Sequence, residues 1–244
     1  MKLLIICGHG GSDPGATGYG YKEAELVRLL GKRIKELGGD NVILGDTSHS
    51  WCKKGTLKTY KVEAGTQILE LHMDSADSKS AKGGHVIYNG RFNADKYDKA
   101  LANFIATQFP GRVNKLVART DLYNLNVAGN RGISYRLMEC GFISNKLDVT
   151  KFNKNIDTLA KGILECFGIK PIVKKEPIYY KKYTGKSDIL DTVLIASGVP
   201  KKYTGSWKNR KPLAKKNGIT VYVGSVKQNT KLISLAKQGK LKRV

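Results

Sequence analysis

The chain has 244 residues, 41% of them hydrophobic, which is enough for one large folded core or two smaller ones. No apolar run approaches the roughly 20 residues that a membrane-spanning helix needs, so the sequence indicates a soluble globular protein that does not insert into a membrane. The formal net charge is +23 and is concentrated at the C-terminal end, where residues 171–244 contain 18 Lys and Arg against three acidic residues. Such a charge attracts polyanions: nucleic acid, an anionic membrane face or an anionic cell wall.

The first apolar run, Leu3–Cys7, is too short for the core of a signal peptide. We therefore expect synthesis in the cytoplasm without a classical export signal. The four cysteines lack the spacing of metal-binding cysteine clusters and are expected to be buried free thiols in a reducing compartment. They are Cys7, Cys52, Cys140 and Cys166.

Leu3–Cys7 predicts a buried strand, and a glycine-rich loop containing His9 follows it. A helical pattern begins at about residue 22 and places Glu23 in its first turn. We expect His9 to point into the crevice at the end of the strand and Glu23 to approach it from the helix. Glu25 is an alternative to Glu23, and a glutamate in a first turn also interacts with the helix dipole alone.

Two later apolar strands also end at groups that bind metal or protons. The run 65–72 ends at His72, and the run 133–139 ends at Glu139. Two imidazoles and one carboxylate make a three-ligand zinc site with an open position for water, and a second carboxylate accepts the proton of that water. His9, Glu23 and His72 are thus candidate Zn²⁺ ligands and Glu139 a candidate general base. The alternatives are solvent-facing or strand-end histidines and a salt-bridged Glu139.

The remaining pattern alternates strands and helices. Strands are expected at 41–44 and 85–88, with helices at 94–109 and 148–167, the last capped by Asp148. The segments 48–61 and 115–132 are polar, and we interpret them as loops near the active site, the first with room for one short helix. This alternation predicts an α/β fold with a mostly parallel sheet flanked by helices.

The helical pattern stops near two prolines, Pro171 and Pro177, and the composition becomes strongly basic. We therefore expect a first domain at 1–170, a linker at 171–179 and a small α+β repeat module at 180–244. Within the module the string KKYTG occurs twice, and a longer echo relates 183–198 to 222–239. Two such copies packed through their helices predict a small pseudo-symmetric core.

Three segments of the first domain resemble the zinc-dependent N-acetylmuramoyl-L-alanine amidases. Residues 7–16 (CGHGGSDPGA) with Lys22 and Glu23 look like the opening signature of that family. Residues 71–76 (LHMDSA) resemble its second histidine segment, and 138–145 (MECGFISN) its catalytic-glutamate segment. The resemblance covers roughly residues 1–168 and implies the zinc amidase fold, zinc as the cofactor and peptidoglycan as the substrate.

The chain departs from that family at two points. No Thr-Arg pair follows the strand at 41–44, and His85 stands where the family often has a glutamate. The first departure affects the contacts of that loop, and the second is expected to alter the wall of the cleft. His85 and Glu70 are otherwise interpreted as structural residues.

The basic tail resembles wall-binding modules at the C-terminus of phage endolysins. The resemblance implies a zinc-dependent amidase catalytic domain at 1–170 and a cell-wall-binding module at 180–244 that holds an anionic wall polymer. It implies an endolysin that stays in the host cytoplasm until lysis and then acts on the wall. Two alternatives remain: a basic nucleic-acid-associated protein with a degenerate hydrolase-like domain, and a zinc hydrolase of another amide. The sequence does not indicate an oligomeric state.

Overall fold

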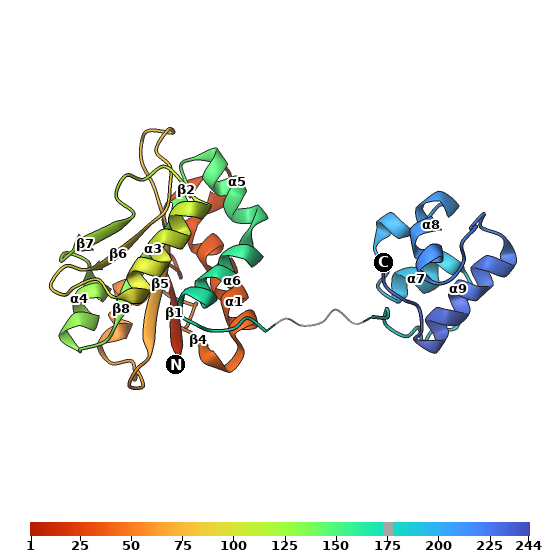
Figure 1. Cartoon of the computed structure of the whole chain (residues 1–244), viewed down its shortest axis with the longest axis horizontal. Helices are drawn as coiled ribbons and strands as arrows, with labels where there is room; N and C mark the ends of the chain where they lie inside the picture. Colours follow the sequence, from red (N-terminus) through yellow and green to blue (C-terminus); the bar gives the residue numbers. More distant parts are fainter. Residues whose placement is uncertain (173–177) are drawn as a thin grey trace. The chain divides into compact units, whose positions relative to one another are not determined.

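The chain forms two compact units, Met1–Val173 and Lys174–Val244. The computed structural model describes residues 1–172 and 178–244, and the ribbon of both units is drawn in Figure 1. The expected linker at 171–179 falls largely on residues 173–177, which lie outside the described residues. Each unit has its own buried apolar cluster.

The first unit is built on a six-stranded sheet with the strand order β4-β1-β5-β8-β6-β7. The first four strands are parallel to one another, β6 is antiparallel to β8, and β7 is parallel to β6. The expected α/β fold with a mostly parallel sheet is thereby confirmed. In spatial order, the strands are β4 (Val42–Leu44), β1 (Leu3–Cys7), β5 (Gln67–Asp74), β8 (Tyr135–Phe142), β6 (His85–Asn89) and β7 (Leu116–Arg119).

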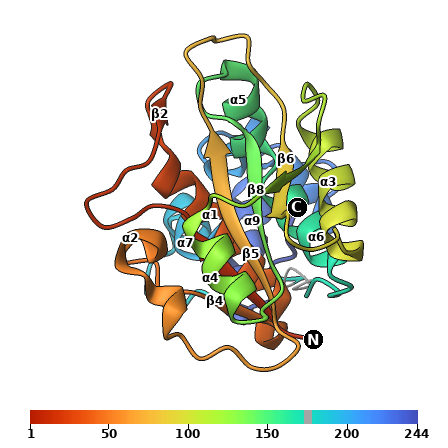
Figure 2. The ribbon, with the colours of Figure 1, turned by 90° about the vertical axis from the view of Figure 1, so that its left-hand side faces the viewer.

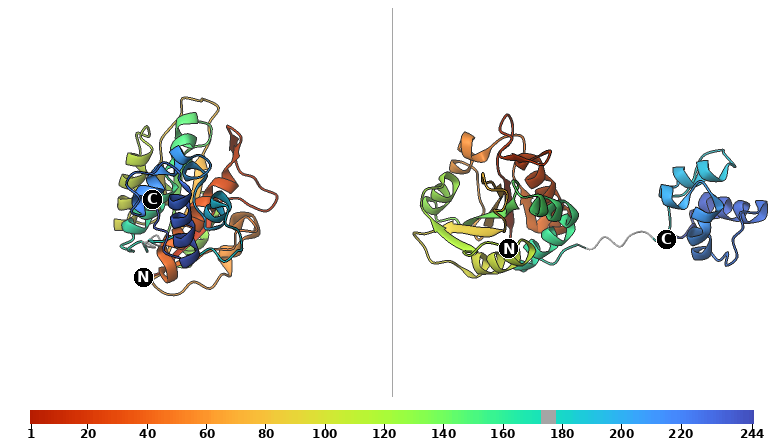
Figure 3. Two further views of the ribbon diagram at one scale, coloured as in Figure 1. Left: turned by 90° about the vertical axis from the view of Figure 1, so that its right-hand side faces the viewer. Right: turned by 90° about the horizontal axis from the view of Figure 1, so that it is seen from above.

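Helices cover both faces of this sheet (Figure 3). One face packs in a large apolar cluster with α1 (Glu23–Gly38), α3 (Lys96–Gln108), α5 (Lys146–Lys154) and α6 (Ile156–Cys166). The other face packs with the shorter α2 (Trp51–Lys54), the 3₁₀ turn η2 (Thr56–Lys58) and α4 (Tyr123–Asn130), of which α4 lies in front of β5 and β8 in Figure 2. A 3₁₀ turn η1 (Gly39–Asn41) follows α1, and a hairpin of β2 (Thr17–Gly18) and β3 (Tyr21–Lys22) precedes it.

The apolar pattern of β1 explains its central position. All five of its residues are buried, as expected for a parallel strand that has a helical layer on each face. In α1 the buried residues Val27, Leu30 and Ile34 recur at helical spacing, and each buried side chain of this size stabilises the fold by about 1.5–3 kcal/mol. This packing fixes the end of β1 against the start of α1, where His9 and Glu23 lie.

Two segments differ from the sequence-based expectation. The polar segment 115–132 contains β7 and α4, and the expected helix 148–167 is divided at Asn155 into α5 and α6. The cap of α5 is Asn145, whose side chain accepts from two backbone N–H groups, rather than Asp148. Asp148 is buried and accepts instead from the backbone N–H groups of Gly83 and Phe142, so it joins the helix to two neighbouring segments.

The second unit is helical, so the α+β expectation for this module is wrong. Its described residues form α7 (Leu190–Ala196), the 3₁₀ turn η3 (Lys201–Tyr203), α8 (Trp207–Lys216) and α9 (Val226–Gln238). These described residues form no β-strand, and their one β-bridge is an isolated pairing of Tyr179 with Lys242. The buried apolar residues of this unit form a core made by the three helices and the loops between them.

The three helices of this unit end in the same way. Each is followed by a glycine with positive φ, namely Gly198, Gly218 or Gly239, and the next N–H returns to a carbonyl in the last turn. Glycine adopts this left-handed conformation without steric cost. Glycines in this conformation therefore end all three helices, including those of the two segments, 183–198 and 222–239, that the sequence echo relates.

Among residues 1–172 and 178–244, no helix combines the length and apolarity that crossing a bilayer requires.

Candidate metal centre and active site

The four candidate site residues come from neighbouring elements at one edge of the sheet. His9 lies just after β1, His72 lies in β5, and Glu139 lies in β8 directly opposite His72 in the strand register. Glu23 is the first residue of α1 and is buried. Parallel strands present their carboxyl ends at the same edge, which is where open α/β sheets bind ligands.

The side chains of His9, Glu23 and His72 converge on one point. One candidate ligand atom from each lies within 4.8 Å of the other two. His9 Nε2 is 3.2 Å from Glu23 Oε2, and His72 Nδ1 is 2.8 Å from Glu23 Oε1. The two imidazole rings meet nearly edge to face, with centroids 5.0 Å apart. Two nitrogen donors and one carboxylate are a donor set that zinc accepts in catalytic sites.

Backbone groups hold the Glu23 carboxylate in place. The N–H of Ala16 donates to Oε2 and the N–H of Met73 donates to Oε1. Burial opposes ionisation of Glu23, but the hydrogen bonds with His72 and His9 outweigh it and keep its pKa well below the ordinary value. Glu23 is therefore ionised at neutral pH, as a metal ligand must be.

Two glycines leave the space that the ligands occupy. A Cβ on Gly8 would lie 2.3 Å from His72 Cε1, and one on Gly15 would lie 2.7 Å from both Glu23 Oε2 and His9 Cδ2. His9 itself has a φ of 60°, a left-handed conformation that is uncommon for residues other than glycine. The glycine-rich loop thus brings the backbone against the imidazole rings and aims His9 at Glu23.

Glu139 is a buried carboxyl group with one unpaired oxygen. Its Oε2 is buried and has no hydrogen-bond partner among the described residues. Burial raises the pKa of Glu139 to about 8, although the nearby His72 opposes this shift. A buried polar atom without a partner is costly in a folded protein, and a water or ion at the centre would supply the missing partner. The orphaned oxygen and the His-Glu-His donor set together fit a bound zinc ion.

Each histidine also contacts a second carboxylate through its other ring nitrogen. His9 Nδ1 lies 3.0 Å from Asp13 Oδ2, and His72 Nε2 lies 3.2 Å from Glu70 Oε1. Carboxylates in this position orient metal-binding histidines. Sequence reasoning missed both contacts and treated Glu70 as structural. The Glu70 contact could have been predicted, because residues two apart in a strand lie on the same face of the sheet, as Glu70 and His72 do.

Arg28 is a further residue that sequence reasoning missed. Its guanidinium donates to the carbonyl oxygens of Gly8, His9 and Thr47, and to that of Ala24 in its own helix. It therefore ties α1 to the loop that carries His9.

A pocket of about 220 Å³ adjoins the two histidines. Beside His9 and His72, its lining includes Cys52 and Lys53 from α2 and Tyr123 from α4. The segments 48–61 and 115–132, which were expected near the active site, thus supply one wall of this pocket. His85 does not line this pocket; it is buried on β6 opposite Glu139, and burial lowers its pKa to about 4.

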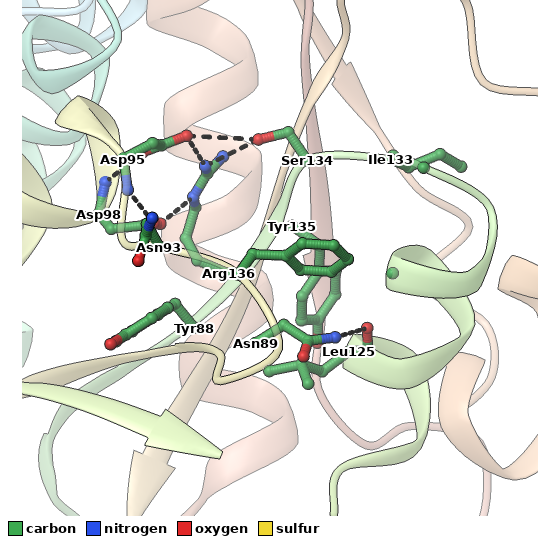
Figure 4. Close-up of a pocket in the computed structure, with 13 residues that line it drawn as sticks. Tyr88, Asn89, Asn93, Asp95, Asp98, Leu125, Ile133, Ser134, Tyr135 and Arg136 are labelled. Atoms are coloured by element: carbon green, nitrogen blue, oxygen red, sulfur yellow. Dashed lines mark hydrogen bonds and ion pairs between the residues drawn. The ribbon is translucent and has the colours of Figure 1, made fainter. Parts of the chain in front are cut away.

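Another pocket, of about 260 Å³, lies where β8 begins rather than where it ends (Figure 4). Its most buried charged group is Arg136, which is 1% exposed. Arg136 donates to Asp98 and Asp95 at 2.8 and 2.9 Å, so two carboxylates neutralise its charge. This pocket contains none of the four candidate site residues, and its charged groups form an internal ion-pair network.

The chain is similar in sequence to known proteins over most of the first unit. The family model described as N-acetylmuramoyl-L-alanine amidase matches residues 3–168. The chain is 35% identical over 190 residues to the probable autolysin PH of Staphylococcus aureus, covering 70% of this chain and 39% of that protein. It is 25% identical over 172 residues to the sporulation-specific N-acetylmuramoyl-L-alanine amidase of Bacillus subtilis, covering 66% of this chain and 65% of that protein. The chain thus spans less than two thirds of the length of either relative.

Solved structures show the same fold. An N-acetylmuramoyl-L-alanine amidase from Clostridium difficile 630 superposes with a TM-score of 0.56 at 18% identity, over 68% of this chain and 94% of that one. The catalytic domain of the CD27L endolysin targeting Clostridia difficile superposes with a TM-score of 0.52 at 27% identity, over 71% of this chain and 99% of that one. The family match, the sequence relatives and the fold lead to one conclusion: the chain belongs to the N-acetylmuramoyl-L-alanine amidase family.

Proposed function

We propose that the first unit hydrolyses the amide bond between N-acetylmuramic acid and the L-alanine of the peptidoglycan stem peptide, with His9, Glu23 and His72 as ligands of a zinc ion. The convergence of these three side chains beside the unpartnered Oε2 of Glu139 is the observation that carries the proposal. Membership of the family supports the choice of bond and substrate.

Zinc held by His9, Glu23 and His72 would supply a Lewis acid for the scissile carbonyl and would lower the pKa of a water beside it. Glu139 takes the proton of that water on its free Oε2 and transfers it to the leaving amine of alanine. Burial raises the pKa of Glu139 in the metal-free chain, which suits the acid half of this transfer, and a dication beside it would favour the ionised form that the base half needs. The pocket beside His9 and His72 receives part of the substrate.

The second unit is proposed to hold the protein to an anionic polymer of the cell wall. Its charge supports this role, because residues 171–244 contain 18 Lys and Arg against three acidic residues. In α8 alone, Lys208, Arg210, Lys211, Lys215 and Lys216 occur without an acidic residue. The same charge would also attract nucleic acid, so a binding comparison between the two polymers is required.

We further propose that the protein is a phage endolysin, which waits in the host cytoplasm and reaches the wall at lysis. The similarity to the CD27L endolysin catalytic domain supports this assignment. The similarity to the probable autolysin supports a cellular wall-remodelling role equally well. Lysis timing in an infected or induced host distinguishes the two roles.

Purified peptidoglycan tests the reaction. Digestion by the full chain should release new free L-alanine amino groups, and a zinc chelator should abolish that release. New reducing sugar ends without new amino groups would refute the amidase assignment.

Removal of residues 178–244 tests the second unit. The remaining chain should still cleave soluble muropeptides and should no longer sediment with intact walls, because the first unit has its own core. Retained sedimentation, or a preference of the full chain for DNA over walls, would refute the wall-binding role.

A further inference from the structure

We propose that Glu70 is a positioning residue for His72, holding the imidazole so that Nδ1 faces the metal position. This inference rests on the zinc site of the proposed function. Glu70 precedes His72 by two positions in β5, so both side chains lie on the same face of the sheet. Its Oε1 lies 3.2 Å from His72 Nε2, while His72 Nδ1 lies 2.8 Å from Glu23. The imidazole is thus held between two carboxylates, one through each nitrogen.

The Glu70 carboxylate is itself fixed. Its Oε2 accepts from the Tyr135 hydroxyl at 2.6 Å and from Asn124 Nδ2 at 2.8 Å. The side chain is 4% exposed, and a buried carboxylate is costly unless such donors compensate it. Tyr135 comes from β8 and Asn124 from α4, so two separate elements hold the group that contacts His72.

Apolar residues also adjoin Glu70. Ile68, two positions earlier on the same face of β5, is fully buried, and the register partner of Glu70 on β8 is the buried Leu137. Both belong to the apolar cluster beneath α2 and α4. A leucine at position 70 would avoid burying a charge, but it would leave the Tyr135 hydroxyl and Asn124 Nδ2 without this acceptor. Apolar packing therefore does not explain a carboxylate at this position, whereas its contacts with His72, Tyr135 and Asn124 do.

A carboxylate that accepts from one imidazole nitrogen fixes the tautomer, leaving the lone pair of the other nitrogen for a metal. It also makes that nitrogen a stronger ligand. Asp13 contacts His9 in the corresponding way, but it lies in a loop and also binds Lys53. Glu70 is buried on a central strand, so we expect it to restrict its histidine more firmly than Asp13 does.

Zinc affinity of the full chain, measured by competition with a chromogenic chelator, tests the inference without relying on catalysis. Glu70→Ala should weaken zinc binding by about 10- to 100-fold, the usual effect of removing such a partner. Glu70→Gln should weaken it by a smaller factor. The amide oxygen still accepts from His72 Nε2, and Asn124 Oδ1, which has no partner among the described residues, can turn to accept from the new NH₂.

Thr66→Val is the matched control. Thr66 is buried just before the same strand, and its hydroxyl has no partner among the described residues. The change removes a buried hydroxyl next to β5 that does not contact His72. It should therefore leave zinc affinity unchanged. A loss of affinity in Thr66→Val equal to that in Glu70→Ala would show a general effect of strand stability and would overturn the inference.

Imidazole ¹⁵N spectra of the zinc-loaded chain give a readout that packing alone does not change. The His72 Nε2 proton should be protected from exchange in the wild type and Glu70→Gln, and exposed to exchange in Glu70→Ala. If Glu70→Ala does not fold, Glu70→Gln decides the question: a His72 Nε2 proton that is exposed to exchange in this variant, with zinc affinity at the wild-type level, would overturn the inference, because the contact would then be lost without effect on the metal site.

These results separate the inference from the proposed function. A wild-type chain that binds zinc but leaves peptidoglycan intact would refute the substrate and leave the role of Glu70 standing. An active zinc amidase in which Glu70→Ala binds zinc as tightly as the wild type would refute the role of Glu70 alone.

Discussion

His72 Nδ1 lies 2.8 Å from Glu23 Oε1, although the two residues are 49 positions apart in the chain. The contact exists because β1 and β5 are adjacent and parallel, with Cys7 paired to Leu71. The loop after β1 and the helix that follows it therefore reach the end of β5. The cluster of His9, Glu23 and His72 is thus a consequence of strand order. A substitution of one of these residues should change the environment of the other two.

Replacing Glu139 with Gln should remove catalysis and preserve the metal site. The amide cannot take a proton from water, so hydrolysis of peptidoglycan should fall by about 10² to 10⁴. Zinc affinity should stay within about twofold of the wild type, since Glu139 lies outside the set of converging donor atoms. Amidase assays and zinc titrations on the same preparation check this, and a joint loss of activity and zinc would instead make Glu139 a ligand.

The stability of the metal-free chain should fall with rising pH because of Glu139. Its pKa is about 8 in the folded chain and near 4.3 when unfolded, so between these values the folded chain binds the extra proton. The resulting stabilisation is complete below about pH 4 and is lost, at about 1.4 kcal/mol per pH unit, as the pH rises through 8.

Urea unfolding of the wild type and Glu139→Gln from pH 5 to 8, both free of metal, measures this effect. The free energy of unfolding of the wild type should fall relative to that of Glu139→Gln as the pH rises. Parallel curves would show that Glu139 keeps an ordinary pKa in the folded chain.

Much of this site follows from strand ends in the sequence. His9 stands just after β1, while His72 and Glu139 lie two and three residues before the ends of β5 and β8, which extend further than the sequence indicated. Parallel pairing brings positions near these strand ends together. The convergence with Glu23 could be anticipated because a helix that returns over a parallel sheet begins near the strand that it follows.

Other features depended on tertiary contacts that no local pattern contains. The segment that forms α4 looked like a loop because its asparagines are polar, yet Leu125 and Ala128 bury one side of it against the sheet. Asp148 resembled a helix cap and instead accepts from the backbone of two other segments. Glu70 was interpreted as a structural strand residue, because the sequence does not show that Asn124 and Tyr135 donate hydrogen bonds to it in the folded chain.

Gly8→Ala should damage the metal site through its volume. The added Cβ would lie 2.3 Å from His72 Cε1, so the imidazole ring or the backbone of residue 8 must shift, which disturbs the alignment of His72 with Glu23. We expect zinc affinity to fall by at least about tenfold and the free energy of unfolding to fall by about 1–3 kcal/mol. Gly90→Ala is the control, because its nearest neighbour is 3.3 Å away at Ala118 and it lies in the loop after β6. Equal zinc affinity in both variants would contradict the close packing of His72 on Gly8.

Cys52 should be the first thiol to react in the native chain. It is exposed, contrary to the expectation that all four cysteines are buried, whereas Cys7 and Cys140 are buried and burial raises the pKa of Cys7 to about 12. Cys52 also lines the pocket beside His9 and His72. A bulky maleimide on Cys52 should therefore slow wall hydrolysis, and Cys52→Ser should be insensitive to the reagent.

Mass spectrometry locates the maleimide adduct, and Cys166→Ser is a control for the half-buried thiol in α6. Full activity of a chain labelled completely at Cys52 would show that the substrate does not use this pocket.

Anomalous diffraction at the zinc edge, from crystals of the full chain grown with one equivalent of zinc, tests the central claim most directly. A single strong peak within bonding distance of His9 Nε2, the Glu23 carboxylate and His72 Nδ1 is the predicted result. A peak at any other group of side chains, with these three residues remaining in mutual hydrogen bonds, would contradict it.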